Sequence, residues 1–200
     1  MTRLFTTLLA LTASLGGAHA APATEHHHGD TPSCIDTTNA ALLAENWGWM
    51  VASWTLNVTK SRELLLSSIA EVGFTDYSDS IRDVESLGCT NGPEPLDDSR
   101  EAFEADQQVL PPFVFNVQKV WHSCDTVTFL WESPATKETG QRSRGIVLLE
   151  VVESTVGPAP RSPTHVIQTA YSEFNTVPFL VNGGVFVPKN CSAAAPTIPN

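Results

Sequence analysis

The segment FTDYSDSI, residues 74–81, places two aspartates and a tyrosine close together, and these side chains could perform acid–base chemistry. An aspartate that faces an apolar pocket has its charged form disfavoured, so its pKa rises towards the range useful for general-base catalysis. Asp76 or Asp79 could act as the base, with Tyr77 as a polar partner. The structural alternative is that these aspartates and serines bond to nearby backbone N–H groups and only turn the chain.

Glu173 raises the same question in the last predicted strand. Tyr171 and Glu173 share one face of that strand, because side chains alternate along extended backbone. If this face points inward, Glu173 is a buried carboxylate that needs a partner, and Tyr77, His122 and Arg144 are candidates. If it points outward, Glu173 is a solvated residue. Apolar residues on both faces leave the choice open.

Other catalytic and cofactor motifs do not occur in the sequence. His122 and His165 are the histidines of the predicted domain, and neither belongs to a nucleophile motif such as GxSxG. We expect both to be structural or surface residues, with His122 kept as a weaker catalytic candidate. There is no phosphate-binding glycine loop, and the three adjacent histidines at 26–28 lie in a segment without preorganised ligand geometry. No metal and no cofactor is predicted.

Aromatic residues suggest a second kind of site. Val127, Phe129 and Trp131 recur at period two, and Trp47 and Trp54 should meet them from the first helix. These rings form either an aromatic core or the wall of an apolar cavity for a small ligand. The ligand-binding candidates are Trp47, Trp54, Phe74, Tyr77, Phe129, Trp131 and Tyr171.

Three helices are predicted to position these residues. Apolar residues at steps of three and four between Ala40 and Trp54 predict a first helix of about five turns, capped by Asp36 or Thr37.

A second helix is predicted from about Thr59 or Ser61, with Val72 on its apolar face and Gly73 as its terminating residue. A third spans residues 98–110. It begins with the capping-box-like spacing of Asp98 and Glu101, and the two prolines that follow end it.

After these helices the apolar period changes to two. Phe115, Val117 and Trp121 fall on one face of a first strand, and three further strands are expected at residues 126–132, 146–152 and 165–175. Helices followed by a run of antiparallel strands indicate an α+β domain, and no internal repeat is visible.

The N-terminus and the charge predict the location of the protein. Arg3, a short apolar stretch and an Ala-His-Ala ending are typical of a signal peptide at residues 1–20, followed by a flexible leader at 21–33. The N-glycosylation sequons at Asn57 and Asn190 suit secretion. A formal net charge of −11 disfavours nucleic acid and anionic membranes as partners.

Several short motifs in a fixed order resemble a known superfamily. A cysteine precedes the first helix, and the 74–81 segment follows the second. WHSC at 121–124, RGI at 144–146 and YSEFN at 171–175 then mark successive strands. From about residue 34 to 175, this order resembles the secreted fungal branch of the nuclear-transport-factor-2-like (SnoaL-like) superfamily.

The resemblance implies a cone-shaped fold. Three N-terminal helices would pack in the concave face of a curved, mixed and mostly antiparallel sheet, with a pocket at the open end. Relatives include polyketide cyclases, dehydratases, isomerases and non-catalytic binding or dimerisation modules, so the fold by itself selects no function.

Four cysteines in a secreted chain suggest two disulfides, for which three pairings exist. In the resembled family Cys34 and Cys124 form the shared pair. Cys89 and Cys191 lie in an enlarged loop and a long tail where this chain departs from the family, so we expect them to pair. The domain would then span residues 34–187, with the tail 188–200 tied by Cys191.

Three functional hypotheses follow. The first is a secreted pocket protein that binds a small, mostly apolar ligand without catalysis. The second is a lyase or isomerase of the polyketide cyclase or dehydratase kind, with Asp79 or Asp76 as base and Tyr77 or His122 as partner. The third is an interaction module that forms a homodimer through its open sheet face.

Overall fold

The computed structural model describes residues 33–86, 95–135, 141–155 and 162–187, all within the compact unit that begins at Pro32. The helices of the described residues are α1 (Thr37–Ser53), the 3-10 turn η1 (Trp54–Leu56), α2 (Val58–Ser68), α3 (Asp79–Ser86), α4 (Arg100–Gln107) and α5 (Thr176–Asn182). The strands are β1 (Thr75–Tyr77), β2 (Asn116–His122), β3 (Thr126–Ser133), β4 (Ser143–Glu153) and β5 (His165–Phe174).

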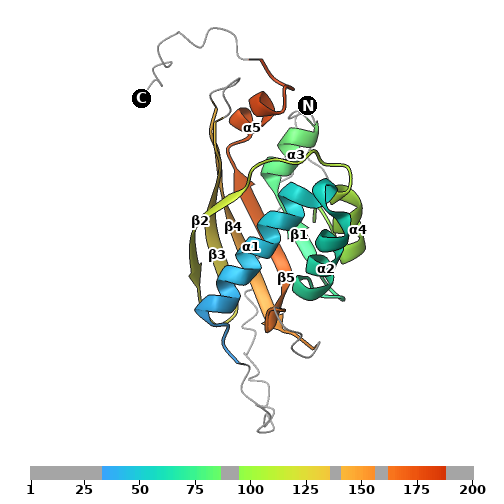
Figure 1. The fold of residues 1–200 in the computed structure, drawn as a ribbon, viewed down its shortest axis with the longest axis vertical. Coiled ribbons are helices and arrows are strands. Elements are labelled where there is room, and N and C mark those ends of the chain that lie inside the picture. Colours follow the sequence, from blue (N-terminus) through green and yellow to red (C-terminus); the bar gives the residue numbers. More distant parts are fainter. Residues whose placement is uncertain (1–32, 87–94, 136–140, 156–161, 188–200) are drawn as a thin grey trace, which may run out of the picture. The chain divides into compact units, whose positions relative to one another are not determined.

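In the described part of the chain these strands form one open sheet in the order β1-β5-β4-β3-β2. Strand β1 is parallel to β5, and the other neighbours are antiparallel. Helix α1 lies across the sheet, with α2 and α4 beside it (Figure 1). The predicted α+β class, with a mixed and mostly antiparallel sheet, is confirmed.

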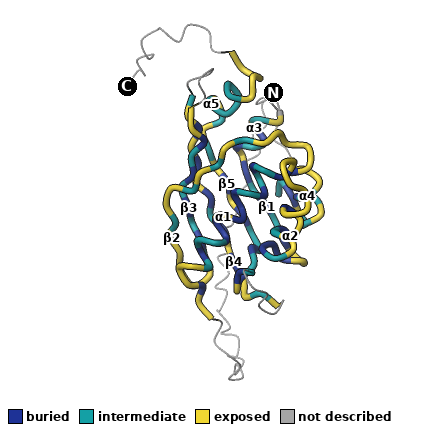
Figure 2. The backbone as a smooth tube through the Cα atoms, in the orientation of Figure 1, coloured by how far each residue is buried: buried dark blue, intermediate teal, exposed yellow. Residues whose placement is uncertain are grey.

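Helix α1 has the predicted cap and buried stripe. The Asp36 side chain accepts a hydrogen bond of 2.8 Å from the Asn39 N–H, which satisfies one of the free donors of the first turn. The same contact holds the pKa of the Asp36 carboxyl below its usual value. Leu43, Trp47 and Met50 of α1 are buried. Figure 2 shows buried stretches along α1.

Helix α2 is shorter than predicted. It ends at Ser68, and Ile69 adopts extended backbone and pairs with Ile167 of β5. The Ala70 N–H also donates to the Ile167 carbonyl at 2.8 Å, so contact with the sheet replaces the last helical turn. Val72 is 83% exposed, and Gly73, with φ of 76°, shapes the turn into β1 rather than the helix end.

Helix α3 was not predicted. The 74–81 segment was expected to place acid–base groups or only to turn the chain, but Asp79 is the first residue of α3. The Glu173 carboxylate of β5 accepts hydrogen bonds from the Asp79 N–H at 3.0 Å and the Ser80 N–H at 3.2 Å, and from the Ser80 hydroxyl. A residue far along the chain therefore caps this helix, which local sequence patterns do not reveal.

Helix α4 confirms the third predicted helix with two changes. Its cap is Ser99, whose hydroxyl accepts from the Ala102 N–H at 3.2 Å, and not Asp98. The helix ends at Gln107, before the predicted end at Leu110. Asp98 therefore lies outside the helix, and its neighbour Asp97 turns inward, where it is 2% exposed.

A β-bulge in β2 changes which side chains face the core. The register with β3 shifts between Val117 and Lys119, so Val120 turns inward and Trp121 outward. Trp121 is 45% exposed, with the Lys119 ammonium 4.8 Å from its ring centre. The expectation that Phe115, Val117 and Trp121 share one face is therefore wrong for Trp121.

The core lies between α1 and the inner face of the sheet. Val127, Phe129 and Trp131 are all buried, as their period-two spacing predicts. Phe74 is fully buried, and its ring packs edge-on against Phe103 of α4, with ring centres 5.6 Å apart. No described helix is long and apolar enough to span a membrane.

A disulfide joins Cys34 to Cys124, the pair that the resemblance implied. It links the segment before α1 to the turn between β2 and β3, beside a 3.1 Å hydrogen bond from the Ile35 N–H to the Cys124 carbonyl. The predicted signal peptide, the predicted leader up to residue 32 and the tail 188–200 lie outside the described residues, as do Cys89, Cys191 and Asn190.

Replacing Trp54 by alanine should destabilise the domain by about 3–5 kcal/mol, because a buried ring leaves a cavity. Trp54 is 2% exposed and packs within the core. Denaturant unfolding measures the loss. The matched control, Trp121→Ala on the outer face, should change stability by about 1 kcal/mol or less. A loss below about 1 kcal/mol for Trp54→Ala would place that ring outside the core.

The second disulfide, Cys89–Cys191, remains a prediction. Peptide mapping of the protein without reduction should yield a Cys34–Cys124 peptide and a Cys89–Cys191 peptide. A link between an enlarged loop and a tail closes a long loop, which the chain-entropy model values at roughly 4–5 kcal/mol. Free thiols at both positions would contradict the pairing.

Candidate functional site

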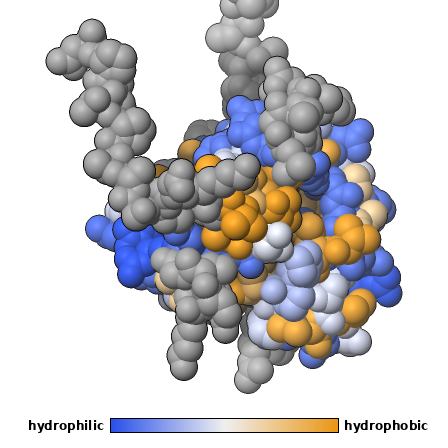
Figure 3. Space-filling model, turned by 90° about the horizontal axis from the view of Figure 1, so that it is seen from above, coloured by the Kyte–Doolittle hydropathy of each residue, from blue (hydrophilic) through white to orange (hydrophobic). Residues whose placement is uncertain are grey.

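A pocket of about 100 Å³ lies between α1, α3, α4, α5 and the inner face of the sheet. Its wall is mostly apolar and is dominated by aromatic rings. The lining rings are Trp47, Phe113, Phe115, Trp131, Phe174 and Phe179. Figure 3, which views the chain from the α5 side, shows apolar side chains gathered on that face.

The aromatic wall is a set of mutually packed rings. Phe115 stacks on Trp131 with centres 4.5 Å apart, and Phe174 packs against Phe179 of α5 at 5.1 Å. Gly145 makes room for the indole. A Cβ there would lie 2.5 Å from the Trp131 Nε1 and 2.6 Å from the Glu173 carbonyl oxygen.

Asp76 is a carboxyl at the polar end of this pocket. It lies in β1, is 1% exposed and lines the pocket, and its Oδ1 has no hydrogen-bond partner among the described residues. Burial, reinforced by the nearby negative charge of Asp97, raises the pKa of Asp76 to about 8. The side chain is therefore held mostly protonated near neutral pH.

Asp97 is paired with Asp76 through the backbone. The Asp76 N–H donates to the Asp97 carbonyl at 2.8 Å, and the Leu96 N–H donates to the Asp76 carbonyl at 2.7 Å. This two-residue bridge continues the sheet beyond the free edge of β1. Burial, followed by the charge of Asp106 and a hydrogen bond to it, raises the pKa of Asp97 to about 7.

Three further polar side chains line the pocket: Gln107, Glu85 and Ser172. Gln107 of α4 is 4% exposed, and its Oε1 has no partner among the described residues. Glu85 of α3 is exposed at the edge of the pocket, and burial together with Asp106 raises the pKa of its carboxyl. Among the described lining residues there is no lysine, arginine or histidine.

The other acid–base candidates of the 74–81 segment lie outside the pocket. Tyr77 points to the opposite face of the sheet, where it stacks on its strand partner Tyr171 with ring centres 5.2 Å apart. Asp79 is exposed and lies 3.6 Å from the Arg82 guanidinium. Tyr77 and Asp79 therefore cannot assist Asp76 in the pocket.

Glu173 also has a structural role. Tyr171 and Glu173 both lie on the outer face, which settles the question left open by the strand pattern. The partners of Glu173 are the N–H groups of α3 and not Tyr77, His122 or Arg144. Arg144 instead bonds to Glu132 at 2.9 Å.

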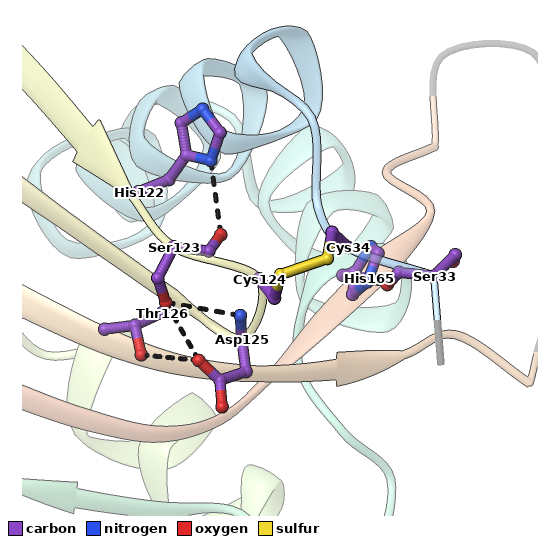
Figure 4. The surroundings of a disulfide bond; sticks show 8 residues. All are labelled: Ser33, Cys34, His122, Ser123, Cys124, Asp125, Thr126 and His165. Atoms are coloured by element: carbon purple, nitrogen blue, oxygen red, sulfur yellow. Dashed lines mark hydrogen bonds between the residues drawn. A yellow bond between two sulfur atoms is a disulfide. The ribbon is translucent and has the colours of Figure 1, made fainter. Parts of the chain in front are cut away.

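The two histidines lie near the disulfide (Figure 4). The His122 Nδ1 is 3.2 Å from the Ser123 carbonyl, and its Nε2 is 3.0 Å from the Thr37 hydroxyl. His165 is buried, and its Nε2 lies 2.8 Å from the Ser33 carbonyl. Neither histidine lines the pocket.

The aromatic candidates divide into three groups. Trp47 and Trp131 line the pocket; Trp54, Phe74 and Phe129 belong to the core; Tyr77 and Tyr171 lie on the outer face.

Gln107 and Glu85 were not predicted as pocket residues, and the contact of Asp97 with Asp76 was not predicted either. Asp97 lies just before the predicted start of the third helix at Asp98, and no periodicity marks its contact with β1. A helical pattern would have placed Gln107 and Phe103 one turn apart on the buried face of α4.

The buried carboxyl predicts a pH-dependent stability. The pKa of Asp76 is raised to about 8 in the folded chain, so the folded state holds a proton that the unfolded state loses above about pH 4. Between about pH 4 and pH 8, Asp76 should lower the free energy of unfolding by about 1.4 kcal/mol for each unit that the pH rises. Denaturant unfolding at a series of pH values between 5 and 8 measures this slope.

In Asp76→Asn this contribution should vanish, so the variant gains stability relative to the wild type as the pH rises. The exposed Asp83 on α3 offers the matched control, and Asp83→Asn should follow the wild-type curve. Parallel curves for the wild type and Asp76→Asn would show that Asp76 does not titrate in this range.

Comparison with solved structures gives similarities of low sequence identity. A candidate SnoaL-like polyketide cyclase from Jannaschia sp. CCS1 has 15% identity and a TM-score of 0.45, with 80% of this chain and 100% of that chain covered. IdmH, a candidate polyketide cyclase from Streptomyces antibioticus, has 14% identity and a TM-score of 0.44, with 74% and 99% covered. TsrD from Streptomyces laurentii has 7% identity and a TM-score of 0.46, with 76% and 99% covered.

These values are too low to transfer any activity to this chain. No curated protein matches the sequence at a significant level. The family model described as an NTF2-like domain matches residues 33–186, which is most of the chain and includes every described helix and strand. The chain belongs to the NTF2-like domain family.

Proposed function

We propose that this chain is a secreted protein that binds a small, mostly apolar molecule in the pocket beside Asp76. One observation carries the proposal: a cavity walled by aromatic rings contains a buried carboxyl whose Oδ1 has no partner among the described residues. An apolar wall with a few oriented polar groups is the usual composition of a small-molecule site.

The size of the cavity limits the ligand. Its volume of about 100 Å³ is of the same order as the engineered cavity of roughly 150 Å³ that binds benzene. A single ring or a short branched chain therefore fits, and larger molecules would need α5 or another element to move. The Phe179 ring of α5 forms part of the wall.

Secretion, and membership of the secreted fungal branch, are part of the same proposal. The predicted signal peptide and the exposed Cys34–Cys124 disulfide suit an oxidising compartment. Asn57 of the first sequon is exposed, and its Oδ1 caps α2 by accepting from the Lys60 N–H at 3.0 Å. This leaves its side-chain nitrogen available for a glycan without loss of the cap.

A second candidate function is proton transfer, in a lyase or isomerase of the cyclase or dehydratase kind. The pKa of Asp76, raised to about 8, lies near physiological pH, as a general base requires. Against this candidate, neither a tyrosine nor a histidine lines the pocket among the described residues, so Gln107 would be the polar partner. A substrate that Asp76→Asn still binds but no longer converts would favour catalysis.

Dimerisation through the outer face of the sheet has less support. Ile146 and Tyr171 are 53% and 41% exposed on that face. However, the charged residues Glu132, Arg144 and Glu150 lie among them on neighbouring strands. A large homodimer interface is generally more apolar than this arrangement.

A pocket-filling substitution tests the proposal. Chemical-shift changes of the full secreted chain should saturate with benzyl alcohol, a ring-sized probe. Val84→Phe on α3 places a ring in the pocket and should weaken this binding by about tenfold or more. Val185→Phe, the same change at an exposed valine outside the pocket, should leave it unchanged.

Loss of binding in Val185→Phe as well, or unchanged binding in Val84→Phe, would show that the probe binds elsewhere. Absence of any saturable shift in the wild type would contradict the proposed function for ring-sized ligands.

A further inference from the structure

We infer that the natural ligand carries a primary ammonium group, which the pocket binds through the Asp76 carboxylate and the Gln107 side-chain oxygen. This inference rests on the proposed function and adds the chemical class of the ligand. It follows from the kind of polar atoms that face the pocket and from the sign of the charge around them.

The pocket atoms without a partner accept hydrogen bonds when Asp76 is ionised. The Asp76 Oδ1 and the Gln107 Oε1 come from β1 and α4, both residues are more than nine-tenths buried, and neither atom has a partner among the described residues. A buried acceptor without a donor is unfavourable, so a ligand that supplies donors stabilises both atoms at once. An ammonium group supplies three N–H donors and no acceptor.

The charged groups that raise the pKa values of Asp76 and Asp97 are carboxyls. The raised pKa values of Asp76 and Asp97 arise from burial and from neighbouring carboxyls, with Asp106 and Glu85 acting on Asp97. Arg82 of α3 lies beside Asp79 and acts on Glu85, but it is not among the groups that shift Asp76 or Asp97. A cation at this end would offset repulsion between carboxylates, whereas an anionic ligand would increase it.

An organic cation fits better than a metal ion. Among the described residues, no three histidine, cysteine, aspartate or glutamate side chains converge to hold a metal. The rest of the wall is aromatic and apolar, which suits the hydrocarbon part of an amine and the faces of rings beside a cation. The ligand class is therefore a small amine with a ring-sized apolar body.

Binding of an ammonium should depend on pH with a defined sign. Asp97 acts on Asp76, and Asp106 and Glu85 act on Asp97. Gln107 and Glu85 line the same pocket as Asp76, and Arg82 of α3 acts on Glu85. In the free pocket Asp76 keeps its proton up to about pH 8, and an ammonium requires the carboxylate. Affinity should therefore rise about tenfold per pH unit below that value and level off above it.

Three probes that share one ring separate the alternatives: benzylamine, benzyl alcohol and benzoate. Calorimetric titration of the full secreted chain at pH 6, 7 and 8 and constant ionic strength gives the affinities. Benzylamine should bind at pH 8 about tenfold or more tightly than benzyl alcohol, and benzoate should not bind. The affinity for benzyl alcohol should vary little with pH.

Two variants test whether Asp76 causes the tighter binding of benzylamine and its pH dependence. Asp76→Asn should weaken benzylamine binding about tenfold or more and remove its pH dependence. Asp83→Asn, the same chemical change on the exposed side of α3, should behave as the wild type.

Equal affinities for the amine and the alcohol, or a pH dependence that survives Asp76→Asn, would overturn the ammonium assignment. Binding of the alcohol would then still support the pocket as a ligand site. If none of the three probes binds, the proposed function fails together with the inference.

Discussion

The carboxylate of Glu173 is the contact on which the geometry of the pocket depends. It lies near the end of β5 and accepts hydrogen bonds from the first N–H groups of α3, so one side chain fixes a helix to the sheet. Helix α3 then places Ile81, Val84 and Glu85 over the pocket. A carboxylate at a helix N-terminus is favoured by both hydrogen bonding and the helix dipole, and this contact is made without a buried unpaired charge.

The opposite arrangement holds at Asp76, where a carboxyl is buried without a donor for its Oδ1. Such a group destabilises the folded chain at neutral pH, and its retention in an otherwise apolar cavity is the pattern expected of a binding or catalytic site. The Asp97 backbone closes the edge of β1 at the same place. The edge of β1 that would otherwise be open to pairing is thereby covered beside Asp76.

Membership of the NTF2-like family explains the architecture but not the chemistry of this pocket. The sheet and its covering helices provide a cavity, and the residues lining it decide what it accepts. Here the motif 74–81 contributes one pocket carboxyl, while its neighbours Tyr77 and Asp79 face the outer side or the solvent. A mechanism transferred from the motif as a whole would therefore assign roles to side chains that do not meet.

The sequence by itself determined the α+β class, the span and cap of α1 and the inward face of β3. Each depends on local periodicity or on a cap within a few residues, which a single chain segment encodes. Only the tertiary structure decided the start of α3, the outward turn of Trp121 and the meeting of Asp76 with Asp97 and Gln107. These depend on a distant carboxylate, on a bulge that reverses the alternation of one strand, and on a loop that completes a sheet edge. Contacts between residues so far apart in the chain leave no periodic signal, so the candidate site emerged only when the elements were packed together.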